Sequence, residues 1–183
     1  MLYYVPMRMP AHTQRLAIVL FFPLLISCMP APTVFSIESS AFADGEMIPA
    51  EYTCDGVGTP PPLSIHNVPE GTKSLALLVE DPDAPGKTYT HWLVWNIDPA
   101  NATLLAVGQK VPTGAMEGKN DAGTIGYVSP CPPSGVHRYN FRLYATDQVL
   151  PMQPGATIQD FYQAIEKVQV LGRARMTGKY KRS

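Results

Sequence analysis

The sequence has no surplus of positive charge, and it lacks two common short catalytic motifs. Its 183 residues hold 14 Lys and Arg against 15 Asp and Glu. A protein that binds nucleic acid by releasing counterions from phosphates needs a basic surplus, so a nucleic acid partner is not expected. No HExxH motif and no serine in a nucleophile elbow is present. The hydrophobic fraction of 45%, with 19 Pro and 14 Gly, predicts one globular domain that is β-rich and has many loops.

Acidic residues are also missing from the amino-terminal part, where the first one is Glu38. Residues 16–26 (LAIVLFFPLLI) form an apolar run that follows Arg8 and Arg15. The run is too short to span a bilayer and is typical of a secretory signal. It ends in residues 25–28 (LISC), which resemble the bacterial lipobox, in which a peptidase cuts before the cysteine and lipid is attached to it.

Cys28 is therefore the predicted lipid attachment site. We predict a signal peptide over residues 1–27, a lipidated tether over 28–33 and a folded domain over 34–183; plain secretion and an uncleaved anchor stay open as alternatives. Met29 does not match the Asp that commonly retains lipoproteins at the inner membrane, so the predicted location is the cell envelope, on the periplasmic side of the outer membrane. Loss of Arg8 and Arg15 from the 14 basic residues, against 15 acidic ones, leaves a formal net charge of −3. Lipid chains are therefore expected to provide the membrane attachment, because electrostatics would not.

The two remaining cysteines, Cys54 and Cys131, match no zinc-ligand spacing. In an oxidising compartment an even pair of cysteines can form a disulfide. Two buried thiols are the alternative, because nothing in the sequence alone brings these residues together. Both interpretations stay open.

Patterns with a period of two residues dominate the chain from Phe35 onward. Residues 74–80 (SLALLVE) form a nearly continuous apolar run, which predicts a buried central strand followed by a Pro-rich turn over 81–86. Residues 91–97 alternate, with His91, Leu93, Trp95 and Ile97 expected on one face. Residues 137–146 alternate as well, with Tyr139, Phe141, Leu143 and Ala145 on one face and Arg138 and Arg142 on the other. Both alternating strands begin with a histidine, which suggests a site at one end of the sheet.

One helix is expected near the carboxyl end. Thr157 can cap it, the apolar residues from Ile158 to Leu171 recur at helical spacing, and Gly172 can end it. A final strand is expected over 176–180. Together the patterns predict a mainly β fold, an antiparallel β-sandwich with one or two peripheral helices.

Three segments carry a resemblance to a known family: 81–85 (DPDAP), 91–92 (HW) and 130–139 (PCPPSGVHRY). Further motifs at similar spacing are 52–56 (YTCDG), 61–63 (PPL), 69–74 (PEGTKS), 120–121 (ND) and 126–127 (GY). From about Phe35 to Arg182 the chain resembles the phosphatidylethanolamine-binding protein family, in its bacterial Raf-kinase-inhibitor-like branch.

The resemblance implies a β-sandwich with a small anion pocket at one end. Six positions of this sequence match the residues that line the pocket in the family: Asp81, His91, Pro132, Pro133, His137 and Tyr139. Tyr89 occupies a neighbouring aromatic position. The chain departs from the family pattern at Ser129, where Gly is usual, and this puts the rim of the pocket in doubt. Pro60 and Ile65 also depart from it.

The chemistry of these side chains agrees with a pocket for phosphate-bearing ligands. Imidazoles supply hydrogen-bond donors and titrate near neutral pH. Asp81 could orient one imidazole or bind the ammonium of an ethanolamine headgroup. The alternative is structural: Asp81 and Asp83 brace turns, and His91 and His137 are satisfied residues at strand ends.

No cofactor or metal is expected, and no catalytic residue is predicted. Two enzymatic alternatives stay open: a metal site of two His and two Asp, and a nucleophilic Cys131 with His137 as its base. The leading hypothesis is a non-enzymatic envelope protein that binds a phospholipid headgroup, a nucleotide or a phosphorylated group. The alternative is a protease or kinase inhibitor that acts through surface loops such as 108–118, with a protease the more reasonable partner. The resemblance also implies a homodimer.

Overall fold

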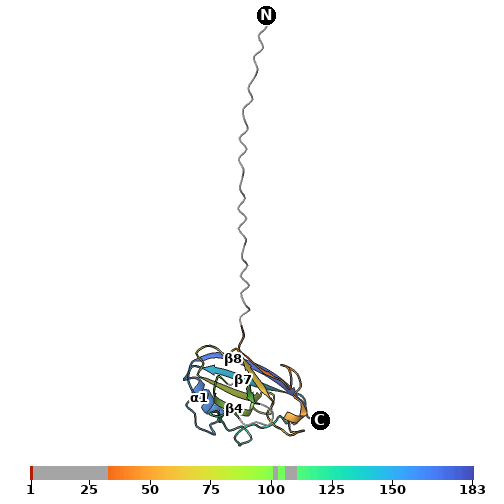
Figure 1. Ribbon diagram of the computed structural model, residues 1–183. Helices are drawn as coiled ribbons and strands as arrows, with labels where there is room; N and C mark the ends of the chain where they lie inside the picture. Colours follow the sequence, from red (N-terminus) through yellow and green to blue (C-terminus); the bar gives the residue numbers. More distant parts are fainter. Residues whose placement is uncertain (2–32, 101–102, 106–110) are drawn as a thin grey trace. The chain divides into compact units, whose positions relative to one another are not determined.

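The computed structural model describes residues 33–100, 103–105 and 111–183, together with Met1 (Figure 1). Thr33–Ser183 forms one compact unit. The predicted signal peptide and the predicted lipid site Cys28 lie outside the described residues, apart from Met1. Within the described ranges, no helix is both long enough and apolar enough to cross a membrane.

Two antiparallel sheets make up the domain (Figure 1). The larger sheet has the strand order β6-β4-β3-β7-β8, and its strands are β3 (Ser74–Asp81), β4 (Tyr89–Ile97), β6 (Met116–Glu117), β7 (His137–Thr146) and β8 (Val170–Tyr180). The smaller sheet has the order β1-β2-β5, with β1 (Ser36–Ser39), β2 (Leu63–His66) and β5 (Thr103–Leu105). A short 3-10 helix, η1 (Ala50–Tyr52), and one α-helix, α1 (Ile158–Ile165), complete the described elements.

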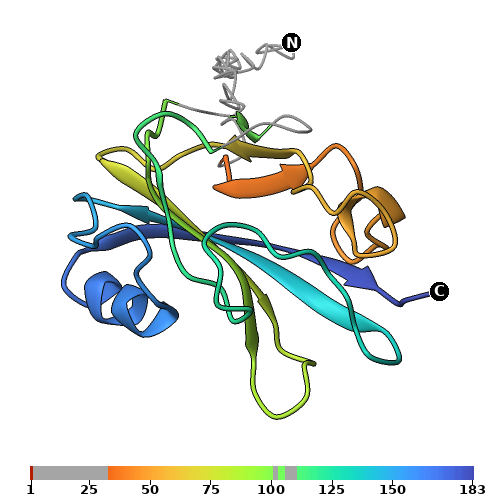
Figure 2. The ribbon, with the colours of Figure 1, turned by 90° about the horizontal axis from the view of Figure 1, so that it is seen from below.

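The larger sheet is covered on both faces (Figure 2). Its inner face packs on the smaller sheet through a cluster that includes Ile65, Leu77 and Phe141. Its outer face packs on α1 through a second cluster that includes Leu93, Trp95 and Phe161. The predicted β-sandwich with a peripheral helix is therefore confirmed.

The central strand β3 is buried along its whole length, as the sequence predicts, because β4 and β7 flank it and both faces are covered. Burial extends to two carboxylates at its end, Glu80 and Asp81. A buried carboxylate needs hydrogen-bond partners. Each of the two has such a partner, on opposite faces of the sheet: Tyr162 for Glu80 and His137 for Asp81.

The predicted helix start is correct and the predicted helix end is wrong. The Thr157 hydroxyl accepts a hydrogen bond from the Asp160 backbone N–H, and the Asp160 carboxylate accepts one from Thr157 N–H, which forms a capping box. The helix stops at Ile165, and the chain from Val170 onward is strand β8. Pairing with β7 over this whole stretch outweighs the helical spacing of the apolar residues.

The predicted faces of β4 are wrong for two residues, because the strand contains two irregularities in register. One lies between the pairs Val79↔Trp92 and Glu80↔Thr90, so His91 is an extra residue in β4. A bulge of this kind turns two successive side chains to the same side. His91 thus lies against Tyr139 on the inner face, while Leu93 belongs to the outer cluster. The other irregularity, near Asn96 with its φ of 55°, places Ile97 in the inner cluster.

Candidate functional site

A pocket of about 250 Å³ lies at one end of the larger sheet. Asp81 ends β3, Tyr89 starts β4 after a short hairpin loop, and His137 starts β7, which runs antiparallel to β3. The ends of these three strands must therefore meet. The lining residues are Asp81, Ala84, Pro85, Tyr89, His91, Val128, Ser129, Cys131, Pro132, Pro133, His137 and Tyr139.

Asp81 and His137 form the polar centre of the pocket. The Nδ1–H of His137 donates to Oδ2 of Asp81 over 2.7 Å, and both side chains are buried. The other oxygen of Asp81 accepts a hydrogen bond from the Asp83 backbone N–H at 2.8 Å. Asp81 therefore holds the imidazole in one orientation, and Nε2 of His137 makes no hydrogen bond with any described residue.

His91 is held in a similar way by the opposite wall. Its Nδ1 lies 2.8 Å from the carbonyl oxygen of Val128, which can only accept, so this nitrogen carries a hydrogen. Burial lowers the pKa of His91 below its ordinary 6.5, and this outweighs the hydrogen bond to Val128 and the charge of Asp81. The ring is therefore neutral at pH 7, and Nε2 keeps its lone pair.

Aromatic rings surround His91 on two sides. The distance between ring centroids is 5.0 Å from His91 to Tyr89 and 5.1 Å from His91 to Tyr139. The Tyr139 ring meets the imidazole edge to face. The Tyr139 hydroxyl is buried and has no hydrogen-bond partner among the described residues. Burial, and then the charges of Asp81 and Asp83, raise the pKa of this hydroxyl, so it stays protonated and is a donor without an acceptor.

The hairpin loop after β3 is fixed by an ion pair at the rim. Arg138 donates through Nε and Nη2 to the two oxygens of Asp83, at 2.8 and 2.7 Å, and its backbone N–H donates to the same carboxylate. The side-chain hydrogen bond from Arg138 is the main cause that lowers the pKa of Asp83 to about 2. The bidentate geometry fixes the position of the loop against β7. Arg138 and Arg142 both point away from the pocket into salt bridges, in agreement with the predicted alternation.

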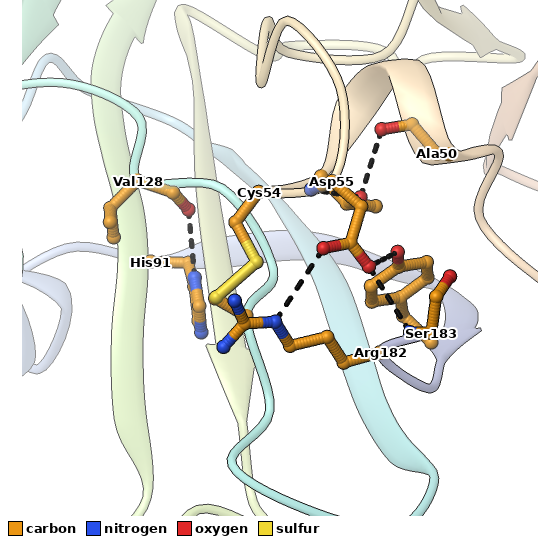
Figure 3. Close-up of a disulfide and its surroundings, with 10 residues drawn as sticks. Ala50, Cys54, Asp55, His91, Val128, Arg182 and Ser183 are labelled. Carbon is orange, nitrogen blue, oxygen red and sulfur yellow. Dashed lines mark hydrogen bonds and ion pairs between the residues drawn. A yellow bond between two sulfur atoms is a disulfide. The ribbon is translucent and has the colours of Figure 1, made fainter.

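The segment from Val128 to Pro133 forms the remaining wall and is tied down by a disulfide (Figure 3). Cys131 is bonded to Cys54, with the two Cα atoms 5.4 Å apart. The Cys54 backbone N–H also donates to the carbonyl of Pro130 at 3.0 Å. Figure 3 shows the bridge between the His91–Val128 hydrogen bond and Asp55, whose carboxylate contacts Arg182 and Ser183 at the end of the chain.

All six residues that the resemblance pointed to line this one pocket, and so do Tyr89 and Ser129. The contribution of Val128, through its carbonyl oxygen, was not predicted. Cys131 was considered only as a disulfide partner or as a nucleophile beside His137, and it forms part of the wall. Hollows of about 410 and 610 Å³ also occur, but neither is lined by a histidine.

The structure does not bring together the groups that the enzymatic alternatives need. The Sγ atom of Cys131 is bonded to Cys54 and is therefore no thiolate nucleophile for His137 to activate. Within the described ranges, no three His, Cys, Asp or Glu side chains form a cluster that could hold a metal ion. The loop over 108–118, expected as an inhibitory surface, lies partly outside the described residues.

Comparison with known proteins places this arrangement in a family context. The family model described as phosphatidylethanolamine-binding protein matches residues 38–181. A UPF0098 protein of Methanothermobacter thermautotrophicus is 49% identical over 150 residues, which cover 80% of this chain and 99% of that protein. The crystal structure of a phosphatidylethanolamine-binding protein homologue of Chlamydia trachomatis matches with a TM-score of 0.77 and 40% identity, over 82% of this chain and 99% of that one. Escherichia coli YbcL, described as a new member of the mammalian family, matches with a TM-score of 0.74 and 32% identity, over 81% and 99%.

Proposed function

The chain belongs to the phosphatidylethanolamine-binding protein family, and on that premise we propose that it is a non-enzymatic binding protein whose pocket takes a small phosphate-bearing ligand. The observation that carries the proposal is the pair of imidazoles, each held through Nδ1, whose Nε2 atoms bond to no described residue. Rings oriented in this way, in a cavity lined by prolines and tyrosines, suit a ligand with several convergent oxygens.

The two histidines have different roles in this proposal. His91 is neutral and offers a lone pair at Nε2, so it accepts a hydrogen bond from a protonated oxygen of the ligand. His137 has its Nδ1–H on the Asp81 carboxylate and, in the imidazolium form, donates from Nε2 as well. An acceptor beside a donor matches a phosphate monoester that carries one proton. Tyr139 supplies a third polar group in the lining.

The size of the cavity narrows the ligand class. Pockets that bury drug-sized ligands measure about 300 to 1,000 Å³. At about 250 Å³, this pocket accommodates a phosphate with a short substituent, such as a phosphoethanolamine headgroup, and leaves any larger group outside.

We further propose that the protein is anchored in the cell envelope by lipid on Cys28, on the periplasmic side of the outer membrane. The support is the apolar run over residues 16–26 and the lipobox-like ending at Cys28. Treatment of producing cells with globomycin should cause the precursor to accumulate. Processing that continues in the presence of the drug would contradict lipidation.

Calorimetric titration with phosphoethanolamine and with inorganic phosphate tests the pocket. We expect saturable binding at millimolar affinity or tighter, about 4 kcal/mol, which is lost in His137→Ala. His66→Ala is the matched control, because His66 lies in β2 with half of its side chain exposed and pairs only with Glu38. Absence of binding to either ligand, or equal loss in both variants, would refute the pocket as the binding site and direct the search to a protein partner.

A further inference from the structure

Five cationic side chains lie on the outer face of β7 and β8. Along β7, Arg138 and Arg142 point away from the inner face, which carries Tyr139 and Phe141. The register places Lys179 opposite Arg138, Arg175 opposite Arg142 and Arg173 opposite Tyr144. Residues that are directly opposite in an antiparallel pair share a face. We call this surface the basic face: Arg138, Arg142, Arg173, Arg175 and Lys179.

Three of these cations are not neutralised within the protein. Arg138 pairs with Asp83 and Arg142 with Glu80. Arg173, Arg175 and Lys179 are exposed and form no salt bridge with a described carboxylate. The segments outside the description contain no Asp or Glu. The guanidinium of Arg173 lies 5.9 Å from the ring centre of Tyr144. This ring is neutral, so the contact does not compensate the positive charge of Arg173.

Two pairs of like charges stand directly opposite each other on this face, Arg138 with Lys179 and Arg142 with Arg175. Like charges in such positions repel each other. Asp83 compensates Arg138 and Glu80 compensates Arg142, so each pair keeps one uncompensated positive charge, on Lys179 and on Arg175. The clustering is local, since the whole chain has a formal net charge of −1 and five of its 14 basic residues are on this one face. The sequence predicts no electrostatic attraction to lipid because the net charge is negative. The net charge does not describe this surface, where the basic residues are concentrated.

The length and the chemistry of the basic face favour a partner that presents many phosphates. It runs from Arg173 to Lys179, about 20 Å at 3.3 Å per residue. Arg142 also lines a hollow of about 280 Å³ beside α1, together with Glu80 and Tyr162. Guanidinium groups bind phosphate well, so a row of exposed cations of this length fits a surface that carries many phosphates.

We propose that the basic face docks on bilayers rich in anionic phospholipid. The charge argument does not depend on lipid at Cys28 or on the ligand of the pocket. The test is co-sedimentation of the full chain with vesicles of phosphatidylcholine alone and with vesicles that also contain phosphatidylglycerol. The apolar segment over residues 16–26 is present in every sample, so the quantity compared is the extra binding caused by phosphatidylglycerol.

We expect phosphatidylglycerol to strengthen binding in a salt-sensitive way, and Arg173→Gln with Arg175→Gln to remove most of this gain. At about fivefold for each cation near an anionic surface, the double variant should lose about 25-fold. The matched control is Lys73→Gln with Lys119→Gln, which makes the same change in charge at two exposed lysines of the loops. It should keep the gain.

Three results would overturn the proposal: no effect of phosphatidylglycerol on the wild-type chain, equal losses in both double variants, or binding to polyglutamate in place of vesicles. The last would assign the face to an acidic protein. His137→Ala should keep vesicle binding, and Arg173→Gln with Arg175→Gln should keep phosphoethanolamine binding. These two variants distinguish failure of the basic face from failure of the pocket, and circular dichroism confirms that each is folded.

Discussion

Removal of the disulfide between Cys54 and Cys131 should cost the protein a large part of its stability. The two cysteines are 77 positions apart in sequence. The loop-closure relation for a cross-link of this length gives about 4.5 kcal/mol at 25 °C, because the unfolded chain regains the freedom that the bridge withholds. Domains of this size are commonly stable by about 5 to 15 kcal/mol, so the change would be easily measured.

The assay is urea unfolding of the wild-type chain and of Cys54→Ser with Cys131→Ser, followed by tryptophan fluorescence. Thiol titration before unfolding verifies that the bridge is present: the wild-type chain has three cysteines and should show one free thiol, that of Cys28. The variant keeps Cys28 and should show the same single thiol. Reduction of the wild-type chain should reproduce the variant. A lower midpoint with a larger slope would show that the unfolded state expands when the bridge is absent.

The same change should weaken the pocket. Cys131 belongs to the wall whose Val128 carbonyl holds His91. Without the bridge, two hydrogen bonds would still link this wall to η1 and the residues after it: Cys54 N–H to the Pro130 carbonyl, and the Tyr127 hydroxyl to the Tyr52 carbonyl. We expect phosphoethanolamine affinity to fall together with stability. A loss of stability below about 1 kcal/mol would refute the reasoning, since it would mean that the bridge does not restrict the unfolded chain.

Three further predictions follow from packing and protonation. Gly178→Ala should destabilise the domain by about 1 to 3 kcal/mol in urea unfolding, because its Cβ would lie 2.5 Å from Ile48, and an unchanged midpoint would contradict this close packing. Tyr139→Phe should raise the free energy of unfolding by about 1 kcal/mol, because a buried hydroxyl without a partner is removed; a clear loss would reveal a partner such as a bound water. The lowered pKa of His91 means that the unfolded chain binds the proton more tightly, so stability should decline as pH falls below about 6.5, and His91→Asn should reduce that slope in melts from pH 7.5 to 5.

Much of the fold was predictable because it depends on local periodicity. The apolar run of β3, the alternation along β7 and the cap at Thr157 each follow from the spacing of side chains in one segment. The end of α1 was not predictable in this way. Val168 and Leu171 continue the helical spacing, and only the presence of β7 beside the chain from Val170 onward decides that Leu171 lies in a strand.

The candidate site was predictable by resemblance, residue by residue, but its geometry was not. Strict alternation places His91 on the face of Leu93, away from Tyr139. The extra residue in β4 reverses this and turns the imidazole toward the pocket. A bulge depends on the register between two strands, and a shift of one residue moves a side chain to the opposite face.

The sequence by itself determined strands β3, β4 and β7 and the helix start and, through the resemblance, the family and six of the pocket residues, because each depends on residue type and short-range spacing. Only the tertiary structure decided which of the two interpretations of Cys54 and Cys131 holds, where His91 points and that Arg173 and Arg175 join the cations of β7 on one face. These features depend on contacts between residues that are far apart in sequence. Strand register determines such contacts, and a periodic pattern within one segment carries no information about its register with another.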